Sequence, residues 1–466
     1  MLRLPTFHLH RPAPIAWTNA LLVLLSTIVL CYLALYNGFP FFYSDTGTYL
    51  WSGFRDYRPP DRPLIYGLFM RYTSLRTSLW LVVFAQSWAV AVLLFWCFKH
   101  FAGKTNYRLW YIAYIFVITF FTGVSINTGQ LIPDVFAAVG ILCIALLLFA
   151  PGLKKWEILL VSVLFILSTG VHNSHFLIVT IILLIFLAAF IFRKSRNALW
   201  KTGVRLRRAV YGLLLVVAAY YGVCTVHYEN KMGYQVNSHG YIFFMARLFD
   251  CGILEQYLAD ECPTRHYKLC EYQGCFPWDF IWDYENSPLY KTGGWDENRD
   301  EYNAIIRDIL TTPKYWPRLI ARETEATFRQ FFNFITGDTN IQEEGSSVMQ
   351  SMRAIWPENM KEFQQSLQQN RGLDWRMLNL FQSYLIGFLL FCSIAVYLVP
   401  GFDPKLKVFL AFILIALLVN AMVCSGISGV LARYQSRVVW LLTLPFMLYL
   451  ASKGAREQGS KGTPLS

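Results

Sequence analysis

Apolar stretches long enough to cross a lipid bilayer follow one another along most of this chain, and they restrict its fold more than any other feature. A membrane-spanning helix needs roughly 20 mostly apolar residues. Hydrophobic residues make up 55% of the sequence and charged residues 15%. Hydropathy predicts about ten spans, at residues 15–36, 77–98, 108–126, 132–150, 156–170, 176–192, 209–226, 380–399, 406–425 and 437–451. We therefore expect an all-α polytopic membrane protein with about ten transmembrane helices.

Basic residues gather in short segments beside the predicted spans, and their distribution predicts the orientation. With the N-terminus inside, the segments 99–108, 154–155, 193–208 and 405–407 and the C-terminal tail all lie in the cytoplasm. The segment 193–208 alone carries seven basic residues. Because cytoplasmic loops are enriched in Lys and Arg, the net charge of +12 indicates membrane topology and contact with membrane lipids, not a nucleic-acid partner. Both termini are predicted to be cytoplasmic.

A loss of hydropathy in the second half divides the chain into three parts. Residues 1–226 are predicted to form a membrane module with about seven spans and a first outer loop at 37–76. Residues 227–379 are long enough for a mainly helical extracytoplasmic domain of their own, and their amphipathic start at 239–258 is typical of an interfacial helix. Residues 380–466 are expected to add about three spans and a cytoplasmic tail.

Four of the ten cysteines lie close together in the outer segment: Cys251, Cys262, Cys270 and Cys275. In an oxidising compartment they most simply form two disulfides, with all three pairings open. Zinc is the alternative, but there is no Cys-x-x-Cys pair and the neighbouring His266 alone does not complete a ligand set. The segment also lacks an Asn-x-Ser/Thr sequence. That favours a bacterial periplasm over an endoplasmic reticulum lumen, and hence a bacterial inner membrane.

Nearly all the unusual polar residues fall on one predicted side of the bilayer. The first outer loop contains Asp45 in the motif Phe42-Tyr43-Ser44-Asp45-Thr46-Gly47-Thr48-Tyr49. It also has an excess of Arg, which the charge rule disfavours on this side. Further polar outer turns occur at residues 127–134, 172–175 and 433–437. We expect these four segments to converge on one outward-facing cavity.

The acid soon after the first span, the many spans with short connections and the soluble outer domain together resemble the GT-C superfamily of integral-membrane glycosyltransferases. The resemblance is architectural and covers most of the chain. It implies a sugar donor on a polyprenyl phosphate or pyrophosphate, and an essential acid in the first outer loop, where Asp45 is the matching position. Many members have paired acids here and a C-terminal soluble domain. This chain has Ser44-Asp45-Thr46 and an outer domain before the last three spans.

The residues themselves suit the same chemistry. Transfer from a lipid phosphate to a hydroxyl needs a carboxylate to accept the proton, which is the role of Asp45, and a cation or metal ion for the departing phosphate. Guanidinium groups match phosphate oxygens. The substrate-binding candidates are therefore Arg58, Arg62, Arg433 and Arg437, with Tyr49 from the Asp45 motif. Each arginine is alternatively an interfacial anchor. The pattern requires no cofactor, but it leaves open whether a divalent cation binds at this site.

Other polar residues near the predicted outer ends of spans extend the set of candidates. His172 and His175 can bind a metal ion or donate hydrogen bonds to sugar or phosphate, or else form an interfacial turn. Asp134 is either a second catalytic or metal-orienting carboxylate or a charge favoured at a helix N-terminus. His239, at the start of the outer domain, is a further substrate-binding candidate. Three tryptophans can stack on sugar faces or, alternatively, form the core of a small domain: Trp278, Trp282 and Trp295.

One function is preferred and two alternatives remain. The preferred function is a glycosyltransferase that moves a sugar from a polyprenyl-linked donor to a glycan, lipid or protein acceptor on the outer side. An O-antigen polymerase or ligase shares this donor but does not need an acid after the first span. A transporter or flippase of lipid-linked saccharides would also carry arginines in its cavity, but the sequence has no inverted repeat and no series of charged mid-span residues.

Overall fold

The computed structural model describes residues 14–103, 106–370 and 372–461, and within these ranges it contains helices and no β-strand. The first half consists of α1 (Pro14–Leu30), α2 (Tyr32–Asn37), α3 (Thr46–Phe54), α4 (Ile65–Thr73), α5 (Trp80–Phe101), α6 (Tyr107–Phe121), α7 (Val124–Gly129), α8 (Val135–Phe149), α9 (Lys155–Gly170), α10 (Asn173–Ala189), α11 (Arg193–Lys201) and α12 (Leu206–Glu229). The all-α expectation is confirmed. The predicted location of the two termini concerns residues 1–13 and 462–466, which lie outside the described ranges.

Four of the described helices are long and apolar enough to cross a membrane: α5, α12, α21 (Arg376–Leu398) and α22 (Pro404–Ile427). Together α10 and α11 meet the same criterion, although they are bent by 106° at the break between them, and counting them as one span gives five. α1, α6 and α8 are apolar but shorter. Each of the ten predicted ranges overlaps a helix, while the number of about ten spans stays a prediction.

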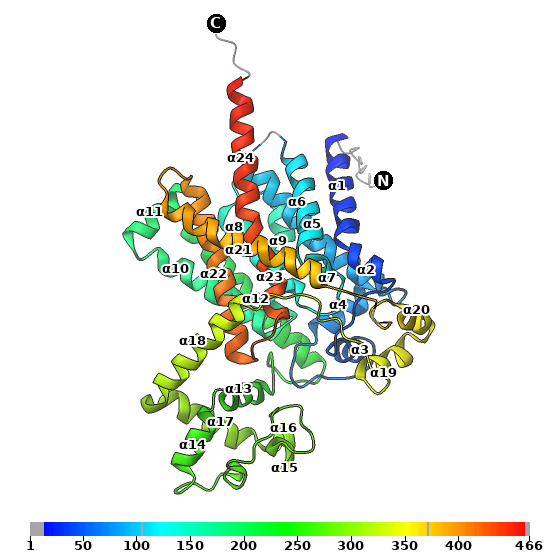
Figure 1. Cartoon of the computed structure of the whole chain (residues 1–466), viewed down its shortest axis with the longest axis vertical. Coiled ribbons are helices and arrows are strands. Elements are labelled where there is room, and N and C mark those ends of the chain that lie inside the picture. The colour runs from blue at the N-terminus through cyan, green and yellow to red at the C-terminus, as the bar shows by residue number, and fades with distance from the viewer. Residues whose placement is uncertain (1–13, 104–105, 371, 462–466) are drawn as a thin grey trace, which may run out of the picture.

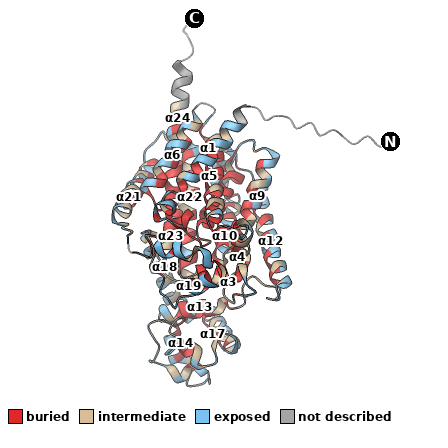
Figure 2. Ribbon diagram, turned by 90° about the vertical axis from the view of Figure 1, so that its right-hand side faces the viewer, coloured by how far each residue is buried: buried red, intermediate tan, exposed pale blue. Residues whose placement is uncertain are grey.

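Burial separates the long helices into inner and outer layers (Figure 2). The most apolar stretch is 78% buried in α5 and 67% in α22, against 33% in α12 and 28% in α21. α8 is buried along nearly its whole length because its sequence has no polar face, and a helix that is apolar all round belongs in the interior. It packs against α5 and α9. The outer helices expose apolar side chains such as Leu214 and Phe391, as a lipid-facing surface requires.

A second, smaller core lies outside this helical body. We call it the small domain; it consists of α13 (Gly240–Asp250), α14 (Ile253–Glu261), η1 (Lys268–Tyr272), α15 (Pro288–Lys291), α16 (Gly294–Glu297), α17 (Arg299–Thr311) and η2 (Pro313–Tyr315). Figure 1 shows this domain at one end of the molecule, while α1 begins and α24 (Thr443–Lys461) ends at the other. α18 (Trp316–Phe332) leads back from the small domain and packs along α22.

The remainder of the predicted outer domain joins the helical body. α19 (Ser347–Ile355) packs against α3, and its buried residues Val348 and Met352 belong to the main core. η3 (Pro357–Asn359) and α20 (Met360–Gln365) follow it. Gly47 permits this close approach, because a Cβ at that position would collide with the backbone of Ser347. The structure thus divides residues 227–379 between two cores, a division that hydropathy did not predict.

The amphipathic stretch 239–258 is not the single interfacial helix that its pattern predicts. The stretch breaks at Cys251 and Gly252, between α13 and α14, where Gly252 adopts a φ of +65°. Its apolar residues, among them Ile242 and Leu254, are buried in the core of the small domain. The pattern of apolar residues identified a buried face correctly, but that face is covered by protein and not by lipid.

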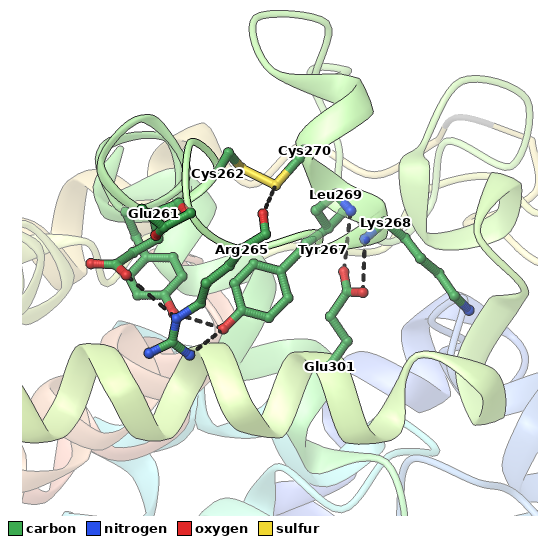
Figure 3. Close-up of a disulfide and its surroundings, with 10 residues drawn as sticks. Glu261, Cys262, Arg265, Tyr267, Lys268, Leu269, Cys270 and Glu301 are labelled. Carbon is green, nitrogen blue, oxygen red and sulfur yellow. Dashed lines mark hydrogen bonds and ion pairs between the residues drawn. A yellow bond between two sulfur atoms is a disulfide. The ribbon is translucent and has the colours of Figure 1, made fainter.

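One disulfide is present among the four outer cysteines, where two were expected. Cys262 pairs with Cys270, while Cys251 and Cys275 are free. Cys251 is buried in the core at the end of α13 and Cys275 is exposed on a turn, so the fold keeps these two thiols apart. Figure 3 shows the disulfide beside α17, where Glu301 accepts hydrogen bonds from two backbone N–H groups of η1 at 2.8 and 3.1 Å.

Candidate functional site

The turn that carries Asp45 is held by backbone bonds to the second outer turn. The N–H of Phe41 donates to the carbonyl of Gly129 at 3.0 Å, and the N–H of Leu131 donates to the carbonyl of Phe41 at 2.9 Å. Thr46 adds a clamp, because its hydroxyl donates to the carbonyl of Leu131 at 3.0 Å. Since α3 begins at Thr46, Asp45 is fixed directly before the first turn of that helix.

The proline-rich loop that carries Arg62 is held from three directions. The side-chain amide of Asn173, at the start of α10, donates to the carbonyl of the residue before Arg62 at 2.8 Å. The hydroxyl of Ser238, at the entry to the small domain, donates to the carbonyl one residue earlier at 2.9 Å. At the end of α12, Nε2 of His227 accepts from the N–H of Leu64 at 3.0 Å. The loop therefore presents Arg62 in a defined position.

Six charged side chains form one network of alternating sign. In the order of their contacts they are Asp61, Arg62, Asp45, Arg433, Asp134 and Arg437. The five successive nitrogen–oxygen distances are 2.6, 3.1, 3.2, 3.6 and 2.7 Å. Arg433 opens α23 (Arg433–Val439), which η4 (Trp440–Leu442) joins to α24, and its Nη1 atom faces both Asp45 and Asp134. Three carboxylates balance three guanidinium groups, so the network is neutral as a whole.

Exposure is highest at Asp45, in the middle of this network, and falls to 8% at Asp61 on one side and to 0% at Arg437 on the other. The side chain of Asp45 is 25% exposed, and those of Arg62 and Arg433 are 12% and 13% exposed. By contrast, Asp134 is 3% exposed and Arg437 is fully enclosed at 0%. The other hydrogen bonds of Arg437 include two to α22 side chains at 3.1 Å. We call Asp45 with Arg62 and Arg433 the exposed end of the network, which can reach a ligand, and Asp134 with Arg437 the buried end, which belongs to the packed interior.

Tyrosine rings cover the two guanidinium groups beside Asp45. Arg433 lies between the rings of Tyr43 and Tyr434, 4.3 and 4.9 Å from their centroids. Arg62 lies over the ring of Tyr49 at 5.3 Å. Such cation–π contacts contribute about 0.5–2 kcal/mol, depending on how far they are desolvated. The rings therefore help to fix where each guanidinium group lies relative to the carboxylate.

A cavity of about 760 Å³ opens beside the exposed end of the network. The helical body contributes Asp45, Arg62, His172 and Arg433 to its wall, and the small domain contributes Phe243, Trp282 and Tyr284. Cavities that bind small molecules typically measure about 300–1,000 Å³ and combine apolar walls with a few polar groups. The candidate site therefore lies where the helical body meets the small domain.

His172 and His175 have ring centroids 5.2 Å apart but different surroundings. His172 lines the cavity, and its Nδ1 accepts from the N–H of Ser174 at 3.2 Å, so the neutral ring carries its proton on Nε2. His175 is buried, and its Nδ1–H donates to the carbonyl of Ser168 at 2.7 Å. Its Nε2 is buried without a hydrogen-bond partner among the described residues. His172 is thus the histidine that a ligand in the cavity can contact.

The ten predicted site residues fall into three groups. Those that line the cavity are Asp45, Arg62, His172 and Arg433. Those that lie behind it in the protein interior are Tyr49, Asp134, His175 and Arg437. Arg58 and His239 do not line it. Burial explains the second group, because each of these side chains packs against the network or the helices that carry it without reaching the cavity.

Arg58 and His239 have other partners. Arg58 pairs with Asp56 at 2.9 Å on the exposed side of the first loop. Nε2 of His239 bonds to Asp296 at 2.8 Å, and its Nδ1 lies 3.3 Å from the carbonyl of Pro60. Arg58 is therefore a surface residue, because its loop turns it away from Asp45, and His239 joins the small domain to the proline-rich loop.

The cavity also contains residues that the sequence did not single out. Tyr434 follows Arg433 directly and Tyr43 lies two residues before Asp45, and these positions near the motif charges are the signal that could have identified them. Phe243 and Tyr284 reach the cavity from the small domain. No sequence signal links these two to Asp45, because the contact depends on how two separate cores are joined. Trp282, a predicted sugar-stacking candidate, does line the cavity.

The charges around the cavity set its protonation states. Burial raises the pKa of Asp45, but Arg62 and Arg433 lower it by more, so the pKa lies well below its ordinary value. Burial and the positive charges of nearby arginines lower the pKa of His172 well below its ordinary value. Burial raises the pKa of Tyr43 to about 12. At neutral pH the cavity presents an ionised carboxylate, a neutral imidazole and a neutral phenol.

Arginines are the cations of this site. Oδ1 of Asp45 faces Arg62 and its Oδ2 faces Arg433. Among the described residues, no group of three or more His, Cys, Asp or Glu side chains is placed to hold a metal ion, at the cavity or among the four outer cysteines.

No protein-family model, no curated protein and no solved structure matches this chain.

Proposed function

We propose that this chain is a membrane glycosyltransferase, which moves a sugar from a polyprenyl-phosphate or pyrophosphate carrier to an acceptor on the outer side of the membrane. The observation that carries the proposal is the position of Asp45 between Arg62 and Arg433, on a cavity of about 760 Å³. A carboxylate flanked by two guanidinium groups suits both halves of the transfer, deprotonation of the acceptor and departure of a phosphate. The architectural resemblance to the GT-C superfamily supports the same reaction.

The donor phosphate binds Arg62 and Arg433 in this proposal. Both guanidinium groups are neutralised by carboxylates in the free protein, so an arriving phosphate competes with Asp45 for them. Guanidinium groups bind phosphate oxygens through paired, charge-assisted hydrogen bonds. When the phosphate takes these bonds, the pKa of Asp45 rises toward its ordinary value. Donor binding therefore makes Asp45 a stronger base only when the sugar is in place.

Asp45 then accepts the proton of the acceptor hydroxyl. The acceptor oxygen attacks the anomeric carbon and forms a new bond to it, while the bond from that carbon to the phosphate oxygen breaks. The electron pair leaves with the lipid phosphate, and Arg62 and Arg433 neutralise the charge that develops there. His172, with its proton on Nε2, can donate a hydrogen bond to the phosphate or to a sugar hydroxyl. A single displacement of this kind inverts the configuration of the sugar.

The aromatic wall of the small domain supplies the acceptor side of the cavity. Phe243, Trp282 and Tyr284 line the cavity from the small domain, and the last two are exposed. Flat aromatic rings bury the apolar faces of a sugar, while Trp and Tyr keep a polar group for its hydroxyls. A glycan or a glycosylated lipid fits such a wall better than an unmodified apolar acceptor does.

The proposal includes a membrane arrangement. About ten helices cross a bacterial inner membrane, the small domain is periplasmic and both termini are cytoplasmic. In support, α1 begins and α24 ends at the end of the molecule far from the small domain (Figure 1). The basic segments 193–208 and 405–407 lie on the predicted cytoplasmic side, as the charge rule requires.

The test compares Asp45→Asn with Asp56→Asn in the full chain. Both changes remove a carboxylate from the first loop, but Asp56 pairs with Arg58 outside the cavity. We expect Asp45→Asn to lower transfer from radiolabelled polyprenyl-linked sugars by about 10²–10⁴-fold, the usual contribution of a general base, with donor binding retained. Asp56→Asn should transfer normally. Full activity of Asp45→Asn would refute the proposal and favour the polymerase, ligase or transporter alternatives.

A further inference from the structure

A second cavity, of about 680 Å³, lies at the opposite end of α22 from the candidate site. Lys405 and Leu406, at the start of α22, line this cavity, whereas Cys424 and Ile427, at its end, line the first. At 1.5 Å per residue, Lys405 and Ile427 are separated by about 33 Å along the helix. That distance is close to the roughly 30 Å hydrocarbon thickness of a bilayer. The second cavity therefore lies at the opposite predicted membrane surface.

Positive charge dominates the wall of this second cavity. Its basic residues are Lys201, Arg205, Arg207, Arg208 and Lys405, while Asp403 is the one carboxylate among the described residues that line it. No ion pair joins any of the five to a described carboxylate. This differs sharply from the first cavity, where every arginine is balanced by an acid.

The five basic side chains differ in their hydrogen bonds to the rest of the protein. Arg208 donates to two backbone carbonyls at the end of α8, at 3.1 and 3.0 Å, and Arg205 donates to the carbonyl of Trp200 at 3.1 Å. These two arginines help to hold the backbone. The side chains of Lys201, Arg207 and Lys405 make no such bond to the described residues, and all three are exposed. Three cationic groups thus remain available to a ligand.

The inner part of the wall is apolar. Phe101, Phe149, Leu406, Phe409 and Leu448 line it, and the rings of Phe101 and Phe149 contact that of Phe409 at 5.5 and 5.4 Å. A cavity with apolar rings inside and ammonium and guanidinium groups at its rim matches a molecule with an apolar part and an anionic head. Basic pockets between membrane helices bind lipid head groups in this way.

The positive-inside rule alone does not account for this arrangement. It predicts basic residues at this membrane surface, and Lys155, Arg193 and Lys194 belong to the same predicted cytoplasmic segments and are exposed. None of these three lines the cavity. The rule explains the number of charges on this side, but not why a particular five converge on one apolar cavity.

We infer that this second cavity is a binding site for a phosphate group, carried on a lipid whose apolar part lies against the aromatic wall. Lys201, Arg207 and Lys405 bind the phosphate, and Phe149 and Phe409 face the acyl or prenyl carbons. The site is separate from the cavity of Asp45 and does not depend on the proposed transfer.

Binding to the full chain in an uncharged detergent tests this inference. The probes are dioctanoyl phosphatidic acid, inorganic phosphate and dioctanoyl phosphatidylcholine, and the measurement is binding by native mass spectrometry and by thermal stabilisation. The test variant is Lys201→Gln/Arg207→Gln/Lys405→Gln. The matched control is Lys155→Gln/Arg193→Gln/Lys194→Gln, which removes the same charge from exposed positions at the same predicted surface.

We expect phosphatidic acid to bind at least about tenfold more tightly than inorganic phosphate, because only the lipid uses the apolar wall. The test variant should weaken its binding roughly 100-fold, and the control should not. The single change Lys405→Gln should weaken it about fivefold, which keeps the test valid if the triple variant misfolds. Equal loss in the control, or equally tight binding of phosphatidylcholine, would overturn the inference. Equally tight binding of inorganic phosphate would overturn the inference that the ligand is a lipid and would indicate free phosphate as the ligand.

Discussion

The exposed end of the charged network, around Asp45, and its buried end, at Asp134 and Arg437, both pair a carboxylate with guanidinium groups, but in different surroundings. Asp45 meets its arginines at 3.1 and 3.2 Å with 25% of its side chain exposed, while Asp134 meets Arg437 at 2.7 Å with both side chains almost fully buried. An ion pair that solvent can reach can exchange a partner for a ligand. A dry ion pair cannot lose a partner without leaving a buried charge. In this network, residue type therefore does not distinguish functional side chains from structural ones, whereas the depth of burial does.

The buried end should break the fold when it is changed. Asp134→Asn leaves Arg437 enclosed without its carboxylate, and removing one partner of a buried pair costs about 3–5 kcal/mol. Asp45→Asn, at the exposed end, should cost less, because Arg62 and Arg433 each keep another carboxylate partner, Asp61 and Asp134. Thermal unfolding in detergent, together with the monodisperse fraction in gel filtration, measures both changes.

The double variant Asp134→Asn/Arg437→Gln is the control for this comparison. It removes both charges, so no buried ion is left without a partner, and it should recover part of the stability lost in Asp134→Asn. If Asp45→Asn were as destabilising as Asp134→Asn, the distinction between the two ends would be wrong. The Asp45 end would then also be part of the structural core.

Two arginines of the first loop sharpen the comparison at the exposed end. Arg62 faces the cavity and Asp45, whereas Arg58 pairs with Asp56 at the surface. Arg62→Gln should lower transfer by about 10²-fold, the usual effect of removing one group that stabilises developing charge. Arg58→Gln should stay within about twofold of the wild type. Steady-state transfer from a lipid-phosphate sugar is the measurement.

Arg62→Lys separates charge from geometry in the same assay. Lysine keeps the positive charge but cannot form the paired hydrogen bonds of a guanidinium group. We therefore expect Arg62→Lys to recover only part of the activity that Arg62→Gln loses. Equal losses in the Arg58 and Arg62 variants would mean that the loop as a whole matters and that the guanidinium group at Arg62 does not act on the phosphate.

The sequence predicts the fold class well because long apolar stretches have few alternatives. Helices α5, α12, α21 and α22 all fall on predicted spans. The division of residues 227–379 could not be predicted in the same way. α13 and α19 are both amphipathic, and the pattern indicates that each buries one face without saying what covers it. α13 is covered by its own small domain and α19 by α3 of the helical body.

The charged members of the site were predictable, but their grouping by depth was not. A carboxylate or guanidinium group near a membrane needs a partner or a function, and this reasoning identified Asp45, Arg62, Arg433 and Asp134. It gave no means to separate Arg433 from Arg437, which lie on one helix face four residues apart. In the structure Arg433 lines the cavity and Arg437 does not. Which side of α23 meets solvent depends on the packing of α22 and α8 around it.

The pH dependence of stability gives the smallest and most selective test of the exposed end. His172 has a pKa well below its ordinary value of 6.5 in the folded chain, so below about pH 6.5 the unfolded chain binds a proton that the folded chain does not. Stability is therefore lost as the pH falls, by at most about 1.4 kcal/mol per pH unit from this residue. The pKa of Asp45 is also lowered, from 3.8, so its contribution is present above that value and is lost only at more acidic pH.

Between pH 7 and pH 5, His172 is thus the one of these two groups that changes stability. His172→Asn should flatten the fall in unfolding temperature over this range, because Asn does not titrate and still caps α10 by accepting from the N–H of Ser174. His266→Asn, on the exposed surface of the small domain, should follow the wild type. If His172→Asn and the wild type lose stability in parallel, the folded chain takes up the proton of His172 as readily as the unfolded chain does. At acidic pH the cavity would then hold one more positive charge than its partners imply, and donor phosphate would bind to a cationic site instead of a neutral network.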